Sequence, residues 1–470
     1  MNARAMFLLT AAAFQSAVLG QTTFERFYGQ NGWPECFFSV VQTPDDGFAA
    51  AGYTESYGAD AGDFWLVRTD SLGSLQWMNL VTGPDNQCAY DVEPVWDGGF
   101  VACGHDYGNG GTSVDMLLVR YTPAGDTAWT RRFGTPDGAE NAMAVVTSPD
   151  SCFVACGRAS TPGHDLIKVS ADGTQIWGRS YPGVNGSFLN SVERLADGYV
   201  LGGVTWDEQN NECIYVVRTD WDGDTVWTRA IRMREYNVGH HVKPTRDGGY
   251  IVCGASSDTL QPSQAALLKL TAAGDTEWTH TFPETYLWYD DFGTDVVEDR
   301  DGGFLLLAWD EAADSLQPFL AKASRSGVVE WTCRPGSAGR AVCYALALTR
   351  DAGLILAGMG ELPDSAYGEA YLLKTDSRGR LAVVERPAAE PRFTGARPAP
   401  NPFRSSVHFV LPSDGPVARV VVADASGRIV YKSLRPDSVW KSGTLPAGVY
   451  CYRITAGGVD YRGRLVKLPR

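Results

Sequence analysis

Residues 96–103 read Trp96-Asp97-Gly98-Gly99-Phe100-Val101-Ala102-Cys103, and this tight turn with the apolar run after it decides the fold. Glycine supplies the positive φ that hairpin turns require, so Asp-Gly-Gly between β-rich runs predicts a β-hairpin. Variants of the unit recur at intervals of 46 to 54 residues. Their last residues are Phe48, Phe100, Phe153, Tyr199, Tyr250, Phe304 and Leu354. A fixed period of this length indicates a repeat architecture.

A second turn recurs in phase with the first, a Gly followed four residues later by Trp. It occurs at Gly73/Trp77, Gly125/Trp129, Gly173/Trp177, Gly223/Trp227, Gly274/Trp278 and Gly327/Trp331. Five residues before each Gly stands a base, and Gly379 continues the series without its Trp. The bases are Arg68, Arg120, Lys168, Arg218, Lys269, Lys322 and Lys374. We expect the Trp side chains to wedge between repeats and the bases to pair with acids of the turns.

Each copy predicts four strands. In the copy that contains Phe100, they are residues 90–95, the run from Phe100 to Cys103, residues 116–120 and residues 129–133. Four short strands in about 50 residues is the size of one propeller blade. The sequence therefore predicts an all-β fold, a seven-bladed β-propeller over residues 21–385.

The two ends of the repeat region are complementary. Residues 24–29 align with residues 129–134, yet no hairpin precedes them. The last copy has Val383 where the others have Trp and then turns Pro-rich. We expect residues 24–28 to be a fourth strand that pairs with residues 370–383 and closes the ring, which would remove two exposed strand edges.

Composition excludes several classes of protein. The 470 residues are 44% hydrophobic and 20% charged, and the net charge of −15 argues against nucleic acid or an anionic membrane as partner. No apolar run reaches the roughly 18 residues of a transmembrane helix. Residues 1–20 combine Arg4, an uncharged apolar run and small residues before Gln21, which predicts a signal peptide. We expect a secreted or cell-surface protein.

Ten cysteines in an exported chain raise the question of disulfides. Cys103, Cys156 and Cys253 share one repeat position that Ala or Gly fills elsewhere, so they are predicted to be small buried residues. Cys36/Cys88 and Cys333/Cys343 are spaced so that either pair could bridge, and both alternatives stay open. There is no CxxC or HExxH motif, so no metal site is predicted.

The Gly-x-x-x-Trp hairpin resembles the tryptophan motif of quinoprotein-type propellers. The likeness extends over residues 24–383 to secreted bacterial repeat proteins of the DGG(F/Y)-(V/I)-x-x-G type. This resemblance implies the architecture, but the sequence shows no set of quinone-stacking or calcium-binding residues, so no cofactor is expected. The hairpins also resemble sialidase Asp-boxes, with the Gly one place too far from the Trp.

The longer loops fall on the ring face opposite the two recurring turns, where propellers usually carry their sites. Aromatic residues beside carboxylates there suit sugar stacking or a protein hot spot, and ordinary loop packing is the alternative. The candidate ligand-binding residues are Trp206, Tyr236, Trp288, Tyr289, Asp290, Asp291 and Trp309. No catalytic residue is assigned. A hydrolase would need carboxylates that converge near the centre of the ring.

A second domain follows a Pro/Ala-rich segment, residues 386–399, predicted to be a linker. Residues 400–470 contain eleven Lys or Arg, four Asp and no Glu, so this segment is basic on an acidic chain. Strands are predicted at 406–411, 416–423, 427–432, 448–455 and 459–468, which form a small immunoglobulin-like β-sandwich.

Four motifs of this domain carry a resemblance to the C-terminal sorting domain of type IX secretion cargo. They are Pro400-Asn401-Pro402-Phe403, residues 424–431, Leu445-Pro446-Ala447-Gly448-Val449-Tyr450 and residues 464–468. The resemblance implies that type IX secretion machinery engages residues 400–470 and exports the chain. An accessory immunoglobulin-like domain is the alternative. Together these features predict an exported propeller that binds a glycan or a protein, with a polysaccharide hydrolase of the glycosidase or sialidase kind as the alternative.

Overall fold

The computed structural model describes most of the chain after Gly20. The described residues are 21–29, 33–56, 62–83, 85–108, 113–135, 138–158, 164–183, 186–258, 263–287, 295–312, 315–337, 339–361, 367–381, 397–399, 406–410, 417–424, 428–433, 439–446, 448–456 and 459–467. The predicted signal peptide, residues 1–20, lies outside them. The chain divides into two compact units, Met1–Ala382 and Val383–Arg470. In the described part, no helix is long and apolar enough to cross a membrane.

Within its described residues, the first unit consists of seven four-stranded antiparallel sheets. Six take their strands in chain order: β2 (Glu35–Gln42), β3 (Phe48–Thr54), β4 (Asp63–Thr69) and β5 (Leu75–Val81); β6 (Gln87–Pro94), β7 (Phe100–Gly108), β8 (Ser113–Tyr121) and β9 (Thr127–Phe133); β10 (Asn141–Thr147), β11 (Phe153–Arg158), β12 (Leu166–Val169) and β13 (Gln175–Arg179); β14 (Ser187–Arg194), β15 (Tyr199–Trp206), β16 (Glu212–Thr219) and β17 (Thr225–Ile231); β18 (Tyr236–Pro244), β19 (Tyr250–Ser257), β20 (Ser263–Leu270) and β21 (Thr276–Leu287); β22 (Asp295–Glu298), β23 (Phe304–Ala312), β24 (Ser315–Ala323) and β25 (Val329–Cys333). The prediction of an all-β fold built from repeated four-stranded units is confirmed.

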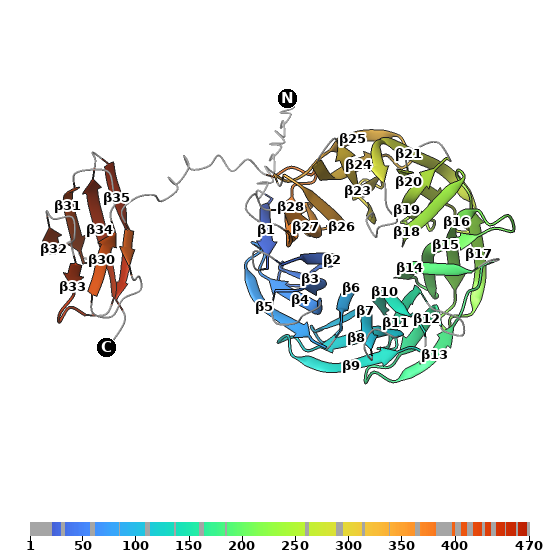
Figure 1. Ribbon diagram of the computed structural model, residues 1–470. Coiled ribbons are helices and arrows are strands. Elements are labelled where there is room, and N and C mark those ends of the chain that lie inside the picture. Colours follow the sequence, from blue (N-terminus) through green and yellow to red (C-terminus); the bar gives the residue numbers. More distant parts are fainter. Residues whose placement is uncertain are drawn as a thin grey trace, which may run out of the picture. The chain divides into compact units, whose positions relative to one another are not determined.

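The remaining sheet takes strands from both ends of the repeat region. Its order is β1 (Phe24–Tyr28), β28 (Gly368–Thr375), β27 (Leu354–Glu361) and β26 (Ala341–Leu348). The register pairs Phe24 with Lys374 and Tyr28 with Ala370, so residues 24–28 do lie in one sheet with the last repeat. Figure 1 shows the sheets arranged in a ring, with the first strand of each repeat nearest the axis.

Neighbouring sheets are joined by the recurrent Trp residues. Trp227 packs against Tyr250 of the next sheet at a ring-centroid distance of 5.7 Å, and its ring fills the space beside Gly274. All six Trp side chains are partly buried and pack against the apolar clusters between sheets. The predicted wedge role is confirmed. Gly274 has a φ of +82° and leaves no room for a Cβ, because Trp227 lies 2.9 Å from that position.

The recurrent bases are buried at the strand ends and pair with the turn acids, as the spacing predicts. The pairs are Arg68–Asp45, Arg120–Asp97, Lys168–Asp150, Arg218–Asp197, Lys269–Asp247, Lys322–Asp301 and Lys374–Asp351. Arg68, Arg120, Arg218, Lys269 and Lys374 also donate to backbone carbonyls; Lys269 Nζ, for example, lies 3.0 Å from the Leu270 oxygen. Each pair therefore fixes the turn at one end of its sheet.

The ten cysteines all lie within the described residues and are free thiols. Neither Cys36/Cys88 nor Cys333/Cys343 forms a bridge, so both possible disulfides are corrected. Cys103, Cys156 and Cys253 are fully buried, as predicted for small apolar residues of a strand. Apolar packing between the sheets takes the place of a disulfide framework here.

The second unit contains two sheets that share one apolar core. One sheet has the order β29 (Arg397–Ala399), β30 (Ser406–Val410), β33 (Val439–Lys441), and the other β32 (Ile429–Ser433), β31 (Val417–Ala423), β34 (Gly448–Ala456), β35 (Val459–Lys467). Trp440 and Val407 of the first sheet pack with Ile454 of the second. The five predicted strands are present, while β33 was not predicted. The predicted end of the linker is wrong, because residues 397–399 form β29. In this strand Pro398 pairs with Phe409 at a sheet edge, where a missing N–H is tolerated.

Candidate ligand-binding site

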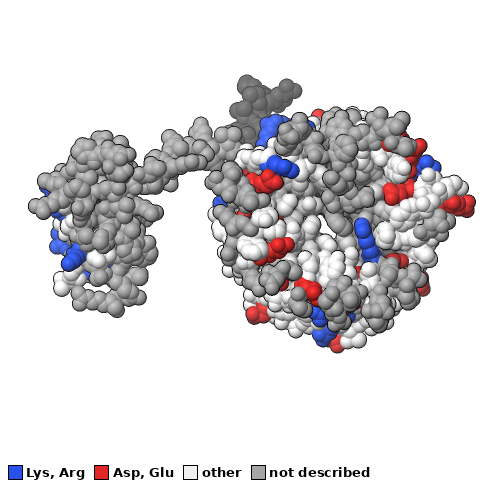
Figure 2. Space-filling model, viewed as in Figure 1, with Lys and Arg blue, Asp and Glu red and all other residues white. Residues whose placement is uncertain are grey.

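The first strands of the sheets surround a cavity of about 340 Å³ along the axis of the ring. Strands β2, β6, β10, β14, β18, β22 and β26 all contribute to its wall. We call this cavity the channel. Its size falls in the range of small-molecule sites. In the space-filling view, the face of the ring is hollowed at this place, and charged side chains of both signs lie around the hollow (Figure 2).

A β-bulge recurs in the channel wall. In six of the seven first strands, the pairing with the second strand skips one residue. A bulge leaves the extra residue out of the ladder and re-aims its side chain. The skipped residues all line the channel, and they are Phe38, Tyr90, Met143, Asn190, His240 and Tyr344. In these six repeats the backbone thus presents one side chain at the same level of the channel.

Three of these bulge residues form an aromatic group, which we call the collar: Phe38, Tyr90 and Tyr344. They come from three consecutive sheets. The ring of Phe38 lies 5.0 Å from that of Tyr344 and 5.5 Å from that of Tyr90. All three side chains are half-buried. The collar therefore offers aromatic surface on one side of the channel, at the end away from the Asp-Gly-Gly turns.

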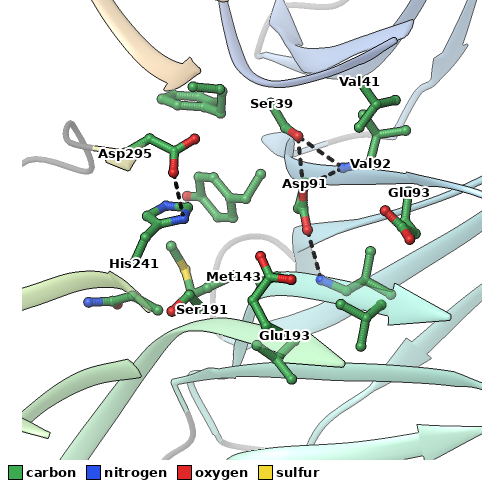
Figure 3. A pocket seen from close by; sticks show the side chains of 18 of the residues that line it. Ser39, Val41, Asp91, Val92, Glu93, Met143, Ser191, Glu193, His241 and Asp295 are labelled. Atoms are coloured by element: carbon green, nitrogen blue, oxygen red, sulfur yellow. Dashed lines mark hydrogen bonds and ion pairs between the residues drawn. The ribbon is translucent and has the colours of Figure 1, made fainter. Parts of the chain in front are cut away.

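Several polar residues that follow a bulge, and Asp295 in the unbulged strand β22, link neighbouring sheets. Asp91 accepts hydrogen bonds from Ser39 Oγ at 2.7 Å and from the Val145 N–H of the next sheet at 2.9 Å. Asp295 accepts from the Leu346 N–H at 3.0 Å, and Ser191 Oγ accepts from the Val242 N–H, also at 3.0 Å. Figure 3 shows the bonds made by Ser39 and Asp91. These hydrogen bonds engage side chains that would otherwise be available to a ligand.

Two further carboxyl groups lie deeper in the channel, on the side of the Asp-Gly-Gly turns. Burial, reinforced by the negative charges of Asp91 and Glu193, raises the pKa of Glu93 to about 8. Burial also raises the pKa of Glu193 to about 7, although Lys243 acts to lower it. Figure 3 shows both side chains directed into the channel from β6 and β14. Neither carboxyl has a hydrogen-bond or ion-pair partner among the described residues.

The lysine among the described residues of the channel wall already has a partner. Lys243 Nζ lies 3.2 Å from Asp295 Oδ1, and His241 Nδ1 lies 3.6 Å from the same oxygen. Burial acts to raise the pKa of Asp295, but Lys243 and His241 hold it below the ordinary value. Burial lowers the pKa of His240 to about 3, so this imidazole is neutral at pH 7. The described wall of the channel therefore contains more carboxyl groups than cations.

The structure places the sequence-predicted residues at several positions. Trp206 ends β15 and packs edge-on against Phe188 at 5.5 Å, and Tyr236 begins β18 with half of its surface exposed. Trp309 is buried in the core between sheets, which is the packing role given as the alternative. None of these three lines the channel. Trp288, Tyr289, Asp290 and Asp291 lie outside the described residues.

Sequence reasoning missed the channel residues because it examined loops rather than first strands. Phe38, Tyr90 and Tyr344 each stand ten residues before the aromatic or Leu that ends the Asp-Gly-Gly unit. Aligning the repeats at this position would have revealed a column of large residues, followed by Ser, Asp or His in several copies and by Ala in others. No group of three or more His, Cys, Asp or Glu side chains in the described part of the chain is placed to hold a metal ion.

No protein-family model and no curated protein matches the chain. Among solved structures, it is similar to an α-L-arabinanase from Penicillium chrysogenum in complex with arabinobiose, at 11% identity and a TM-score of 0.46, covering 76% of this chain and 98% of that one. It is also similar to the α-L-arabinofuranosidase arb93a from Fusarium graminearum (9%, TM-score 0.46, 76% and 97%). The extracellular domain of BT4673 from B. thetaiotaomicron gives 9% identity and a TM-score of 0.45, with 94% of this chain covering 59% of that one.

Proposed function

We propose that this chain is an exported seven-bladed β-propeller that binds a glycan at the collar end of its channel. The observation that carries the proposal is the combination of aromatic faces with carboxyl groups that have no partner, all lining one cavity. Aromatic rings provide apolar surface with defined faces, and buried polar groups fix the orientation of a ligand. A sugar ring presents both a flat apolar face and hydrogen-bonding hydroxyls.

A thermal-shift screen of the full chain against polysaccharides and oligosaccharides tests this proposal. A ligand at 100 times its Kd adds about 2.7 kcal/mol of stability, which is enough to shift the melting temperature measurably. Replacing Phe38 and Tyr344 by Ala should abolish the shift, whereas Tyr236→Ala, an exposed aromatic residue outside the channel, should leave it intact. A shift lost with Tyr236→Ala instead would move the site to the loops. No shift with any glycan would contradict the proposal.

A polysaccharide hydrolase is the second candidate, because carboxyl groups do converge at the centre of the ring. Glu93 and Glu193 have raised pKa values of about 8 and about 7, which suits a general acid near neutral pH. Any glycan found in the screen should be assayed for new reducing ends. Under this reading Glu93→Gln abolishes turnover while binding persists; binding without turnover by the parent chain favours the binding module.

We also propose that residues 400–470 direct export through type IX secretion machinery, as the motif resemblance implies. The compact second unit that these residues form supports a separable role. In a host with that machinery, deleting residues 400–470 should retain the chain inside the outer membrane. Export of the truncated chain at the parent level would show that the domain is an accessory.

A further inference from the structure

We propose that the glycan bound in the channel carries a free primary amine, and that its ammonium group lies between Glu93 and Glu193. This inference rests on the proposed glycan-binding function and specifies the ligand class. It starts from the unequal numbers of acids and bases that face the channel. Among the described residues, four acids line the channel wall: Asp91, Glu93, Glu193 and Asp295.

Two of these four acids are already satisfied. Asp295 is paired with Lys243, and Asp91 accepts from Ser39 and two backbone N–H groups. Glu93 and Glu193 have no such partners within the described residues. They nevertheless belong to repeats whose other copies place Val41, Val146 or Ala347 at the same level. Lys243 stands at this level as well, but its ammonium group is paired with Asp295. The two half-buried glutamates therefore present acceptors to the channel that no described residue occupies, and a cationic ligand would fill them.

The electrostatics of the channel favour a cation over a neutral group. Burial raises the pKa of both glutamates, and the negative charges of Asp91 and Glu193 raise that of Glu93 further. Arg194 and Lys243 act in the opposite direction on Glu93, but Arg194 is exposed and donates to the Thr147 oxygen, while Lys243 is held by Asp295. His240 and His241 have lowered pKa values and supply no positive charge at neutral pH. An ammonium group bound between these two carboxyls would lower their pKa values and so favour their ionised form.

The collar explains why the cation belongs to a sugar. A lysine side chain offers an aromatic ring only a narrow alkyl stem and its ammonium group. A pyranose ring can stack on Phe38 or Tyr344 while its substituents reach the carboxyl groups, and an ammonium near an aromatic face gains a cation–π contribution. The cavity of about 340 Å³ has room for one or two sugar rings.

Calorimetric titration of the full chain with two matched disaccharides tests the inference. The probes are the β-1,4-linked dimers of glucosamine and of N-acetylglucosamine, at pH 7. We expect the free-amine dimer to bind at least tenfold more tightly. In the Glu93→Gln/Glu193→Gln double variant this preference should vanish, and in Glu330→Gln, an exposed carboxylate of outer strand β25, it should persist.

The possible outcomes separate the inference from the proposed function. Equal affinity for the two dimers, or a preference that survives in the double variant, overturns the inference and leaves glycan binding in place. The inference is also overturned, and glycan binding kept, when a neutral glycan binds in a way that depends on Phe38 but the free-amine dimer does not bind. Binding of Nα-acetyl-lysine amide but of no sugar overturns both, in favour of a protein partner. Failure of both dimers to bind overturns the inference, and the proposed function falls with it only where the screen also finds no other glycan.

Discussion

Asp91 in β6 accepts a 2.9 Å hydrogen bond from the backbone N–H of Val145 in the next sheet. An acceptor side chain on a first strand therefore satisfies a backbone donor of its neighbour, and Ser191 repeats the arrangement with Val242. The inner ends of the sheets are thus fixed to each other by hydrogen bonds, while the Trp wedges join their outer ends. This division predicts how individual substitutions act.

Removing the Asp91 acceptor should destabilise the ring. Asp91→Ala leaves the Val145 N–H without its acceptor in a buried position, which costs about 1–3 kcal/mol. Asp91→Asn retains a carbonyl oxygen and should lose less. Urea unfolding of the full chain measures both effects, and Ser191→Ala provides a second inter-sheet bond for comparison. Unchanged unfolding in Asp91→Ala would show that water replaces the carboxylate.

Alanine substitutions at two glycines distinguish the cost of backbone strain from the cost of steric contact. Gly248 and Gly274 have nearly equal φ values of +85° and +82°, but a Cβ at Gly248 meets nothing within 4 Å. Left-handed backbone costs a non-glycine residue roughly 1–2 kcal/mol. Gly248→Ala should lose about that much, and Gly274→Ala should lose more because its methyl group meets Trp227. The excess should disappear in a Trp227→Ala background; equal losses in the parent chain would argue against close packing of the Trp.

The raised pKa of Glu93 predicts how stability depends on pH. The folded chain keeps this proton up to about pH 8, whereas an unfolded chain releases it near the ordinary value of 4.5. Between these values unfolding releases a proton, so the contribution of Glu93 to stability falls as the pH rises. Glu93→Gln should therefore gain stability relative to the parent from pH 5 to pH 8 and level off above.

Chemical unfolding at pH 5, 7 and 9 measures this difference, and Glu330→Gln is the control, because its carboxylate is exposed on β25. The charged groups that face Glu93 are Asp91, Glu193, Arg194 and Lys243. A difference between variant and parent that stays constant over the whole pH range would mean that Glu93 ionises in the folded chain near its ordinary pKa.

The free cysteines predict a simple pattern of thiol reactivity. Cys451 is exposed and should react first with a disulfide reagent in the native chain. Cys333 is partly buried, and burial raises its pKa to about 11, so it should follow slowly. Unfolded without reductant, the chain should show ten thiols. A count of eight would indicate one disulfide and reopen Cys36/Cys88 and Cys333/Cys343.

The sequence predicts much of the fold because its two turns repeat in phase. Gly274 and Trp227 are visible as a pattern, since the turn needs positive φ and the wedge needs an aromatic residue at a fixed distance from it. The channel was not predicted, because Phe38 and Tyr90 reach it through a bulge, and a one-residue insertion in a strand changes which face a side chain takes. The β33 strand was missed because three residues carry too little pattern to recognise.

The pairing of β1 with β28 has a consequence for the order of events during biogenesis. Phe24 leaves the ribosome early, but Lys374, its partner in the closing sheet, is made only after every other repeat. Until then the growing array has an open strand edge at each end, and such edges can recruit other chains. In a chain that is exported unfolded, Phe24 and Lys374 pair only after both have crossed the membrane. Late closure of the ring is therefore compatible with export.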